Sequence, residues 1–312
     1  MSETAYPLGE YHVGDLLDIL EVAEVGLVRA ALTCEPANPQ VELPEQTARV
    51  FVGGSQKQRY QRTFGGQLLA QGIVAAGRTV VRGRQVHSIH ATFLAGGADT
   101  DPVHYVVEAL GEGRSFSTRQ VLAVQRGRVL ATMNVSFQTA ASGVEHQTPM
   151  PAAPDPRDVP NVAEALAGVP GPYALVCVLD GPIEMRHVQG TLYAGPGPER
   201  SVDQGVWVRS VRPLPDDPLV HAAFLAYASD YSILEPVLRG HGLHWGDPRL
   251  RQASLDHSMW FHRSGRADGW VLHSGHSPSA SGGRGLGIGH MYDRQGRLLA
   301  TVAQEGMLRL KE

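Results

Sequence analysis

The hydrophobic pattern between Asp217 and Leu238 predicts a helix that carries a carboxylate on its apolar side. Steps of four and three residues place five positions on one stripe: Leu219, Ala223, Ala226, Asp230 and Ile233. Asp217 suits the N-cap and Pro218 the first helical position. The stripe is expected to face the core, where a carboxylate is poorly solvated and can serve as a base if polar groups hold it. The alternative is that Asp230 caps a second short helix ending near Pro236, or closes the first.

Periodic and alternating positions predict the remaining elements. The first half is expected to contain a helix at 13–20, strands at 24–32 and 50–53, a small-residue helix entered at Gly65-Gly66, and strands at 86–94, 102–110, 114–125 and 128–138. Residues 33–46, rich in Pro, Glu and Asn, indicate an exposed insertion. The second half repeats this order, with strands at 183–188 and 206–211, the Asp217 helix, and strands at 251–262, 270–276, 283–292 and 298–310. The glycine entrance leaves backbone N–H groups available to whatever lies there.

The two halves also share a short segment of nearly identical sequence. Gly127-Arg-Val-Leu-Ala-Thr132 recurs as Gly296-Arg-Leu-Leu-Ala-Thr301, each time at the start of a last long strand. Upstream, we align Arg119 with Arg284 and the Gly65-Gly66 entrance with Asp230. The order of elements predicts an α+β architecture of two long helices, each wrapped by a curved antiparallel sheet, which is a double hot-dog fold. We expect an N-terminal module at 1–138, a linker at 139–171 and a C-terminal module at 172–312.

Gln304 is the only polar side chain on the face of its strand that should be buried. A buried amide needs hydrogen-bond partners, so Gln304 either braces the core or addresses a site. It aligns with Val135 in the first copy, just as Asp230 aligns with Gly65. Because folding should make similar demands on both copies, a polar pair confined to the second copy favours one site per chain.

A second carboxylate competes with Asp230 for the role of base. In the strand at 251–262, Ser254, Asp256 and Ser258 are expected to share one face. A serine in a strand most often has no catalytic role. Of the two carboxylates we favour Asp230, because of the contrast between the copies.

Composition narrows the function classes. The chain has 27 Lys and Arg against 31 Asp and Glu, and its basic residues do not form blocks. We therefore do not expect it to bind nucleic acid. No apolar run has membrane-spanning length and the N-terminus does not resemble a signal peptide, so we expect a cytoplasmic protein that does not bind membranes. Cys34 and Cys177 are too few for a disulfide framework or a structural zinc site. The histidines show no metal-ligand spacing.

Four segments closely resemble signature segments of the acyl-CoA thioesterase II family: Phe64-Gly-Gly-Gln67, Ala226-Tyr-Ala-Ser-Asp230, Ser254-Leu-Asp-His-Ser-Met-Trp-Phe-His262 and Ala303-Gln-Glu-Gly306. The resemblance runs from about Leu17 to the C-terminus. It implies a double hot-dog enzyme that hydrolyses fatty acyl-CoA to free fatty acid and CoA without metal or cofactor. The family's catalytic Asp, Ser or Thr, and Gln fall on Asp230, Ser254 and Gln304. The segment 30–49 is longer than the family usually shows, which bears on the substrate entrance.

The expected mechanism is attack by water on the thioester, with Asp230 as base and Ser254 and Gln304 orienting the water. Two other classes stay open: a hot-dog enoyl-CoA hydratase using an Asp/His pair, and a non-catalytic acyl-CoA-binding protein. A serine hydrolase is disfavoured because Gly275-His-Ser-Pro-Ser279 ends in Ser where a nucleophile elbow needs Gly. Burial of the sheet faces favours a homo-oligomer, a dimer or a tetramer.

Overall fold

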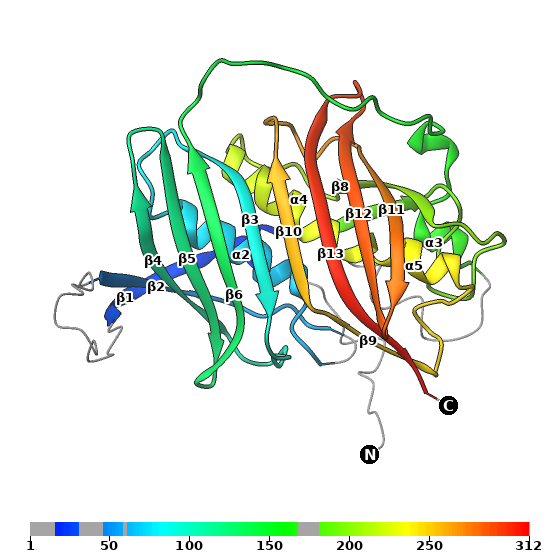
Figure 1. The fold of residues 1–312 in the computed structure, drawn as a ribbon, viewed down its shortest axis with the longest axis horizontal. Coiled ribbons are helices and arrows are strands. Elements are labelled where there is room, and N and C mark those ends of the chain that lie inside the picture. The colour runs from blue at the N-terminus through cyan, green and yellow to red at the C-terminus, as the bar shows by residue number, and fades with distance from the viewer. Residues whose placement is uncertain (1–15, 31–45, 59–60, 168–180, 312) are drawn as a thin grey trace.

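A single curved antiparallel sheet of thirteen strands runs through both halves of the chain, and helices cover one of its faces (Figure 1). The computed structural model describes residues 16–30, 46–58, 61–167 and 181–311. The strands of the first half are β1 (Val22–Ala30), β2 (Gln46–Gly53), β3 (Gln85–Phe93), β4 (Val103–Glu112), β5 (Phe116–Gln125) and β6 (Arg128–Gln138). Those of the second half are β7 (Ile183–His187), β8 (Asp203–Ser210), β9 (Leu250–Ser254), β10 (Asp256–Phe261), β11 (Val271–Ser281), β12 (Arg284–Asp293) and β13 (Leu298–Leu310).

The described helices are α1 (Leu16–Leu20), α2 (Gly65–Gly77), α3 (Val162–Ala165), α4 (Pro218–Ser232) and α5 (Glu235–Gly240), with a 3-10 turn at Pro156–Asp158. These elements follow the predicted order with two exceptions: the strand predicted at 251–262 is divided into β9 and β10, and α5 is a separate helix. Several strand ends also differ by a few residues. The predicted insertion at 33–46, apart from its last residue, and both cysteines lie outside the described residues.

Counted outward from the middle of the sheet, the corresponding strands of the two halves come in the same order. It runs β1-β2-β4-β5-β6-β3-β10-β13-β12-β11-β8-β7, with β9 pairing the end of β13. The two halves meet where β3 and β10 pair antiparallel, with His90 opposite Ser258. The sheet therefore continues from one half of the sequence into the other without a gap.

Helices α2 and α4 lie side by side under the sheet and run antiparallel. At one end, a Cβ added to Gly65 would lie 2.7 Å from Oδ2 of Asp230. At the other end, a Cβ added to Gly77 would lie 2.7 Å from Cδ1 of Leu219. Almost every residue of α2 is buried, as expected of a helix built from small residues that approaches its neighbours closely.

The start of α4 is as predicted and its end is not. Oδ1 of Asp217 accepts a hydrogen bond of 2.9 Å from the backbone N–H of Leu219, and Pro218 takes the first helical position. The helix stops at Ser232 rather than continuing to Leu238, and α5 follows after Ile233 and Leu234. Asp230 does not cap this second helix, whose first turn contains Pro236. The stripe prediction was also too narrow, because all residues from 221 to 229 are buried.

The alignment of the repeat needs a correction at the helices. Asp230 is the thirteenth residue of α4 and Gly77 is the thirteenth residue of α2, so the counterpart of Asp230 in the first copy is Gly77 and not Gly65. The error arose because α5 adds residues to the second half before the next strand. Likewise, Gly287 lies opposite Gln304 where Arg119 lies opposite Val135, so Arg284 is not the counterpart of Arg119.

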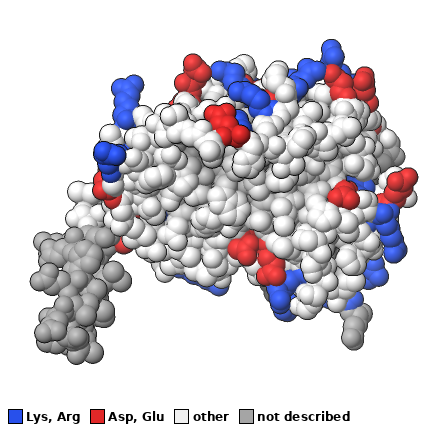
Figure 2. Space-filling view, turned by 45° about the horizontal axis from the view of Figure 1, so that its top comes forward, with Lys and Arg blue, Asp and Glu red and all other residues white. Residues whose placement is uncertain are grey.

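On the face shown in Figure 2, charged side chains lie mainly around the edge, with acidic and basic groups interspersed. That face therefore carries no broad basic field of the kind that binds nucleic acid. Within the described part of the chain, no helix combines the length and the apolar character that crossing a membrane would need.

The junction between α4 and α5 packs directly on β11 and β12. A Cβ on Gly287 would overlap the carbonyl oxygen of Ile233, which belongs to the backbone of this junction. Nδ1 of His273 lies 2.9 Å from Oγ of Ser232, the last residue of α4. These contacts set the depth at which the end of α4 lies against the sheet.

We expect Gly287→Ala to lower the free energy of unfolding by about 1–3 kcal/mol or more, because backbone cannot move aside as a flexible side chain can. Thermal unfolding of the variant measures this. Gly143→Ala is the matched control, since a Cβ on Gly143 meets nothing within 4 Å. Equal melting temperatures for the two variants would show that the junction is not tightly constrained.

Stability should also fall in acid because of His273. The imidazole is buried, and burial, followed by the nearby His257, lowers its pKa to about 4. Below about pH 6.5 the unfolded chain binds a proton at this histidine and the folded chain does not. The contribution of His273 to the free energy of unfolding is therefore fully present above that pH and is lost as the pH falls towards 4. The loss approaches about 3 kcal/mol. Urea unfolding from pH 7.5 to 4.5 measures it, and His273→Asn should flatten the slope; an unchanged slope would contradict the assignment.

Candidate active site

Asp230 lies in the last turn of α4, where its carboxylate meets the first turn of α2. Oδ2 accepts a hydrogen bond of 2.7 Å from the backbone N–H of Gly66. The N-cap of α2, Phe64, offers no side-chain hydrogen bond, so a carboxylate from another helix satisfies this end of α2. The positive end of the helix dipole also favours the negative charge there. The glycine entrance predicted to offer free N–H groups therefore gives one of them to Asp230.

The second oxygen of this carboxylate is differently placed. Oδ1 of Asp230 is buried and accepts no hydrogen bond from the described residues. A buried carboxylate oxygen has a strong need for a donor. The two oxygens thus have separate roles, since one anchors the side chain and the other can accept a proton or a hydrogen bond.

Ser254 and Gln304 are in direct contact. Gln304 lies near the middle of β13 with only 1% of its surface exposed, and its Nε2 donates a hydrogen bond of 2.9 Å to Oγ of Ser254. Ser254 ends β9 and lies opposite Gly306, on the same face of the sheet as Gln304. The sequence prediction that Gln304 faces the buried side is confirmed.

A buried histidine connects this pair to the end of α4. Nδ1 of His257 bonds Oε1 of Gln304, and Nε2 of His257 lies 3.1 Å from Oγ of Ser229. Ser229 immediately precedes Asp230. The Asp230 charge acts on the ring by favouring its protonated form, but burial outweighs it and lowers the pKa of His257. Ser254, Gln304, His257 and Ser229 therefore form one polar cluster beneath the sheet, and Asp230 adjoins it as the residue after Ser229.

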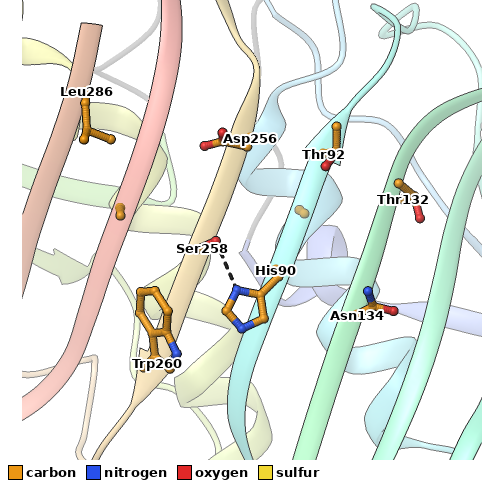
Figure 3. A pocket seen from close by; sticks show the side chains of 10 residues that line it. His90, Thr92, Thr132, Asn134, Asp256, Ser258, Trp260 and Leu286 are labelled. Carbon is orange, nitrogen blue, oxygen red and sulfur yellow. Dashed lines mark hydrogen bonds between the residues drawn. The ribbon is translucent and has the colours of Figure 1, made fainter.

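Asp256 is not part of this cluster. Its Oδ1 accepts a hydrogen bond of 2.8 Å from the backbone N–H of Glu305. With Ser258, Trp260 and His90 it lines an open hollow of about 390 Å³ on the uncovered face of the sheet (Figure 3). Nδ1 of His90 lies 3.1 Å from Oγ of Ser258. The hollow and the Ser254–Gln304 pair lie on opposite faces of the sheet.

The prediction that Ser254, Asp256 and Ser258 share a face was wrong, because the strand is interrupted at Leu255. The backbone N–H of Leu255 donates to Glu305 and its carbonyl oxygen accepts from Phe93, both at 2.9 Å. Leu255 thus bridges two strands, and the alternation restarts at Asp256. This change of phase turns Asp256 and Ser258 to the outer face and His257 to the inner one.

Sequence reasoning missed two members of the cluster, His257 and Ser229. The histidines were considered as metal ligands, and His257 was assigned no role. Its place within Leu-Asp-His-Ser-Met-Trp was the available signal, but unbroken alternation assigned it to the face away from Ser254. Among residues 16–30, 46–58, 61–167 and 181–311, no group of three or more His, Cys, Asp or Glu side chains is placed to hold a metal ion.

Comparison with known proteins decides the family. A family profile described as acyl-CoA thioesterase matches residues 184–307, and one described as the acyl-CoA thioesterase N-terminal domain matches residues 55–138. Acyl-CoA thioesterase 2 of Haemophilus influenzae is 35% identical over 273 residues, covering 84% of this chain and 93% of its own length. The chain belongs to the acyl-CoA thioesterase family. The suspected resemblance is thereby confirmed, as is the expectation of a thioester hydrolase.

Solved structures agree with this assignment. The crystal structure of an acyl-CoA thioesterase II from Mycobacterium marinum has a TM-score of 0.71 and 37% identity, covering 95% of this chain and 99% of its own. A conserved protein of unknown function with a hot-dog fold from Alicyclobacillus acidocaldarius has a TM-score of 0.67 at 22% identity, covering 85% and 94%. The second likeness concerns the fold alone, and it supports a hot-dog architecture for this member of the acyl-CoA thioesterase family.

We expect Gly65→Ala to lower turnover by up to about 10²-fold, because the sequence resemblance assigns the base to Asp230 and displacement of a reacting group by about 1 Å can cost that much. The new Cβ would lie 2.7 Å from Oδ2 of Asp230 and 3.1 Å from Cζ of Phe93. Gly72→Ala in the same helix is the control, since its Cβ would meet the flexible thioether of Met133. Acyl-CoA hydrolysis assays on both variants test this, and equal activities would mean that the Asp230 position is not critical.

Proposed function

We propose that this thioesterase hydrolyses fatty acyl-CoA to free fatty acid and CoA by means of a water molecule activated by Asp230 and oriented by Ser254 and Gln304. The single observation that carries the proposal is the asymmetry of the Asp230 carboxylate. Oδ2 is anchored on Gly66, whereas Oδ1 is buried and has no donor among the described residues. A base needs an ionised oxygen that is held in place and still able to accept a proton.

The chemistry follows from this arrangement. The water oxygen attacks the thioester carbonyl carbon while one water proton passes to Oδ1 of Asp230. The tetrahedral intermediate then breaks its carbon–sulfur bond, and the proton leaves Asp230 for the departing sulfur, which gives the CoA thiol and the carboxylic acid. General base catalysis contributes about 10²–10⁴-fold, and positioning of the water supplies more. Backbone N–H groups at the start of α2 are suitable donors to the developing oxyanion.

We also propose that the sheet consists of two tandem hot-dog modules, at 1–138 and 172–312, joined by a linker at 139–171. The matching order of strands on either side of the β3–β10 junction supports this division. So do the two family profiles, which match one half each. The catalytic residues named above all belong to the second module, while Gly66 of the first anchors one of them.

The hydratase alternative is less well supported. Addition of water to an enoyl-CoA by an Asp/His pair needs an imidazole nitrogen that reaches the substrate. Both ring nitrogens of His257, the histidine next to Asp230, are already directed at Gln304 and Ser229. A non-catalytic acyl-CoA-binding role would leave the partly bonded carboxylate unexplained.

We propose further that the protein is a cytoplasmic homo-oligomer, a dimer or a tetramer. The uncovered face of the sheet supports the oligomeric part of this proposal. Trp260 lies on this face with 40% of its surface exposed, and it lines the hollow together with His90 and Asp256. Exposed aromatic side chains of this kind are common where subunits meet.

Asp230→Asn should reduce turnover by about 10²–10⁴-fold, because the amide cannot accept the water proton. The fold should persist, since the amide oxygen can still accept the hydrogen bond from Gly66. Release of free CoA, read with a thiol reagent, measures turnover and separates hydrolysis from hydration, which releases no thiol. Binding of a non-hydrolysable acyl-CoA analogue should remain near the wild-type level.

Asp256→Asn is the matched control, because it removes a carboxylate two residues beyond Ser254 in the chain but on the outer face. It should retain nearly full activity. Full activity of the Asp230 variant would remove this residue from the base role, and loss of activity in the Asp256 variant alone would transfer the role to Asp256.

A further inference from the structure

We propose that His257 is a positioning residue that fixes the orientation of the Gln304 side-chain amide, and through it the direction of the Ser254 hydroxyl. The inference rests on the proposed function, because it explains how the water-orienting pair is kept in one arrangement. His257 itself does not face the reacting atoms, since both of its ring nitrogens are turned to protein groups.

His257 occupies a closed position between two elements. It lies in β10 opposite Ala91 of β3 and has no exposed surface. On one side its Nδ1 bonds Oε1 of Gln304 on β13, and on the other its Nε2 lies 3.1 Å from Oγ of Ser229 on α4. The ring thus connects the strand that carries the amide with the helix that carries the carboxylate.

The chemistry of the partners determines which ring nitrogen carries the proton. An amide oxygen can only accept a hydrogen bond, so Nδ1 of His257 must be the donor. Burial lowers the pKa of His257, which leaves the ring neutral with a single N–H. Nε2 is therefore an acceptor. Oγ of Ser229 lies 3.1 Å from Nε2 and 3.0 Å from the carbonyl oxygen of Ala226, so these two acceptors compete for the single hydroxyl proton.

A fixed N–H at Nδ1 allows only one orientation of the Gln304 amide. If the amide were turned over, its NH₂ group would face the N–H of His257, and two buried donors would oppose each other without an acceptor. In the observed orientation, Nε2 of Gln304 donates to Oγ of Ser254 at 2.9 Å. The N–H at Nδ1 and the observed orientation of the amide therefore require each other, and the direction of the Gln304–Ser254 hydrogen bond depends on both.

The hydroxyl of Ser254 is the last group in this chain of hydrogen bonds. Because its oxygen accepts from Gln304, its own proton stays available to donate to the attacking water. In the reversed amide, Oε1 of Gln304 would accept the Ser254 proton, and the hydroxyl could no longer donate to water. His257 thus selects the state of the pair that can hold water oxygen towards the thioester.

The test uses two substitutions of closely similar shape. Asn and Leu both branch at Cγ into two terminal atoms, but only Asn can place an N–H where Nδ1 of His257 lies. We expect His257→Asn to keep most of the wild-type kcat. His257→Leu should lower kcat by up to about 10²-fold, the cost of a misplaced reactant, with KM nearly unchanged. Equal kcat values for the two variants would overturn the proposal.

A double-mutant cycle separates positioning from a general structural role. In the Gln304→Ala background the amide is absent, so His257→Leu should cause no further loss of kcat. If its effect is instead multiplied in that background, His257 acts independently of Gln304 and the proposal fails. Should His257→Leu not fold, His257→Gln replaces it, because its amide nitrogen reaches the Nε2 position and leaves Nδ1 without a donor.

The outcome is distinguishable from failure of the proposed function. Turnover by Asp230→Asn would contradict the base assignment, whatever the His257 variants do. An inactive Asp230→Asn together with equally active His257→Asn and His257→Leu would leave the base in place and remove only the positioning role.

Discussion

The arrangement of the site depends on one hydrogen bond between two helices, from the N–H of Gly66 to the carboxylate of Asp230. It joins the start of α2 to the end of α4, and each group supplies what the other lacks. The first turn of α2 has no side-chain cap of its own, and the carboxylate is removed from much of the solvent. The interaction with the helix terminus lets a negative charge lie inside the protein without an ion-pair partner among the described basic side chains.

The remaining contacts keep this interaction in register with the sheet. The carboxylate can reach α2 only if α4 ends at the correct depth, and the contact of Ile233 with Gly287 sets that depth. Gly287 in turn lies opposite Gln304, so the strand that supports the end of α4 also aligns the amide. The short strand β9 pairs with the end of β13 and brings Ser254 into contact with Gln304. Helix position and amide position are thus coupled through neighbouring strands.

Much of this fold could be predicted from the sequence because it depends on local periodicity. Capping by Asp217, the small-residue helix after Gly65 and the burial of Gln304 all follow from patterns a few residues long. The family resemblance added the roles of Asp230, Ser254 and Gln304, which are proposals that the Asp230 and His257 variants address. Periodicity alone would not have separated Asp230 from Asp256.

The failures have a common physical cause, since each depends on contacts between distant segments. The interruption at Leu255 is a matter of backbone hydrogen bonds to Glu305 and Phe93, which no local pattern reveals. The early end of α4 and the addition of α5 depend on how the chain meets β12, and they shifted the alignment of the two copies. The role inferred for His257 became visible only when that change of phase placed it beside Gln304.

The antiparallel contact of α2 with α4 has two ends, and at only one of them, among the described residues, does a carboxylate accept a hydrogen bond from the other helix. Where Asp230 approaches Gly65, the equivalent corner is closed by Leu219 against Gly77. Two identical subunits related by symmetry would be obliged to place the same residues at both corners. Joining the copies in one polypeptide removes that constraint. One end of the helix pair can then carry a carboxylate while the other is filled by apolar packing. Introducing an acid at position 77 would therefore require Leu219 to be replaced as well.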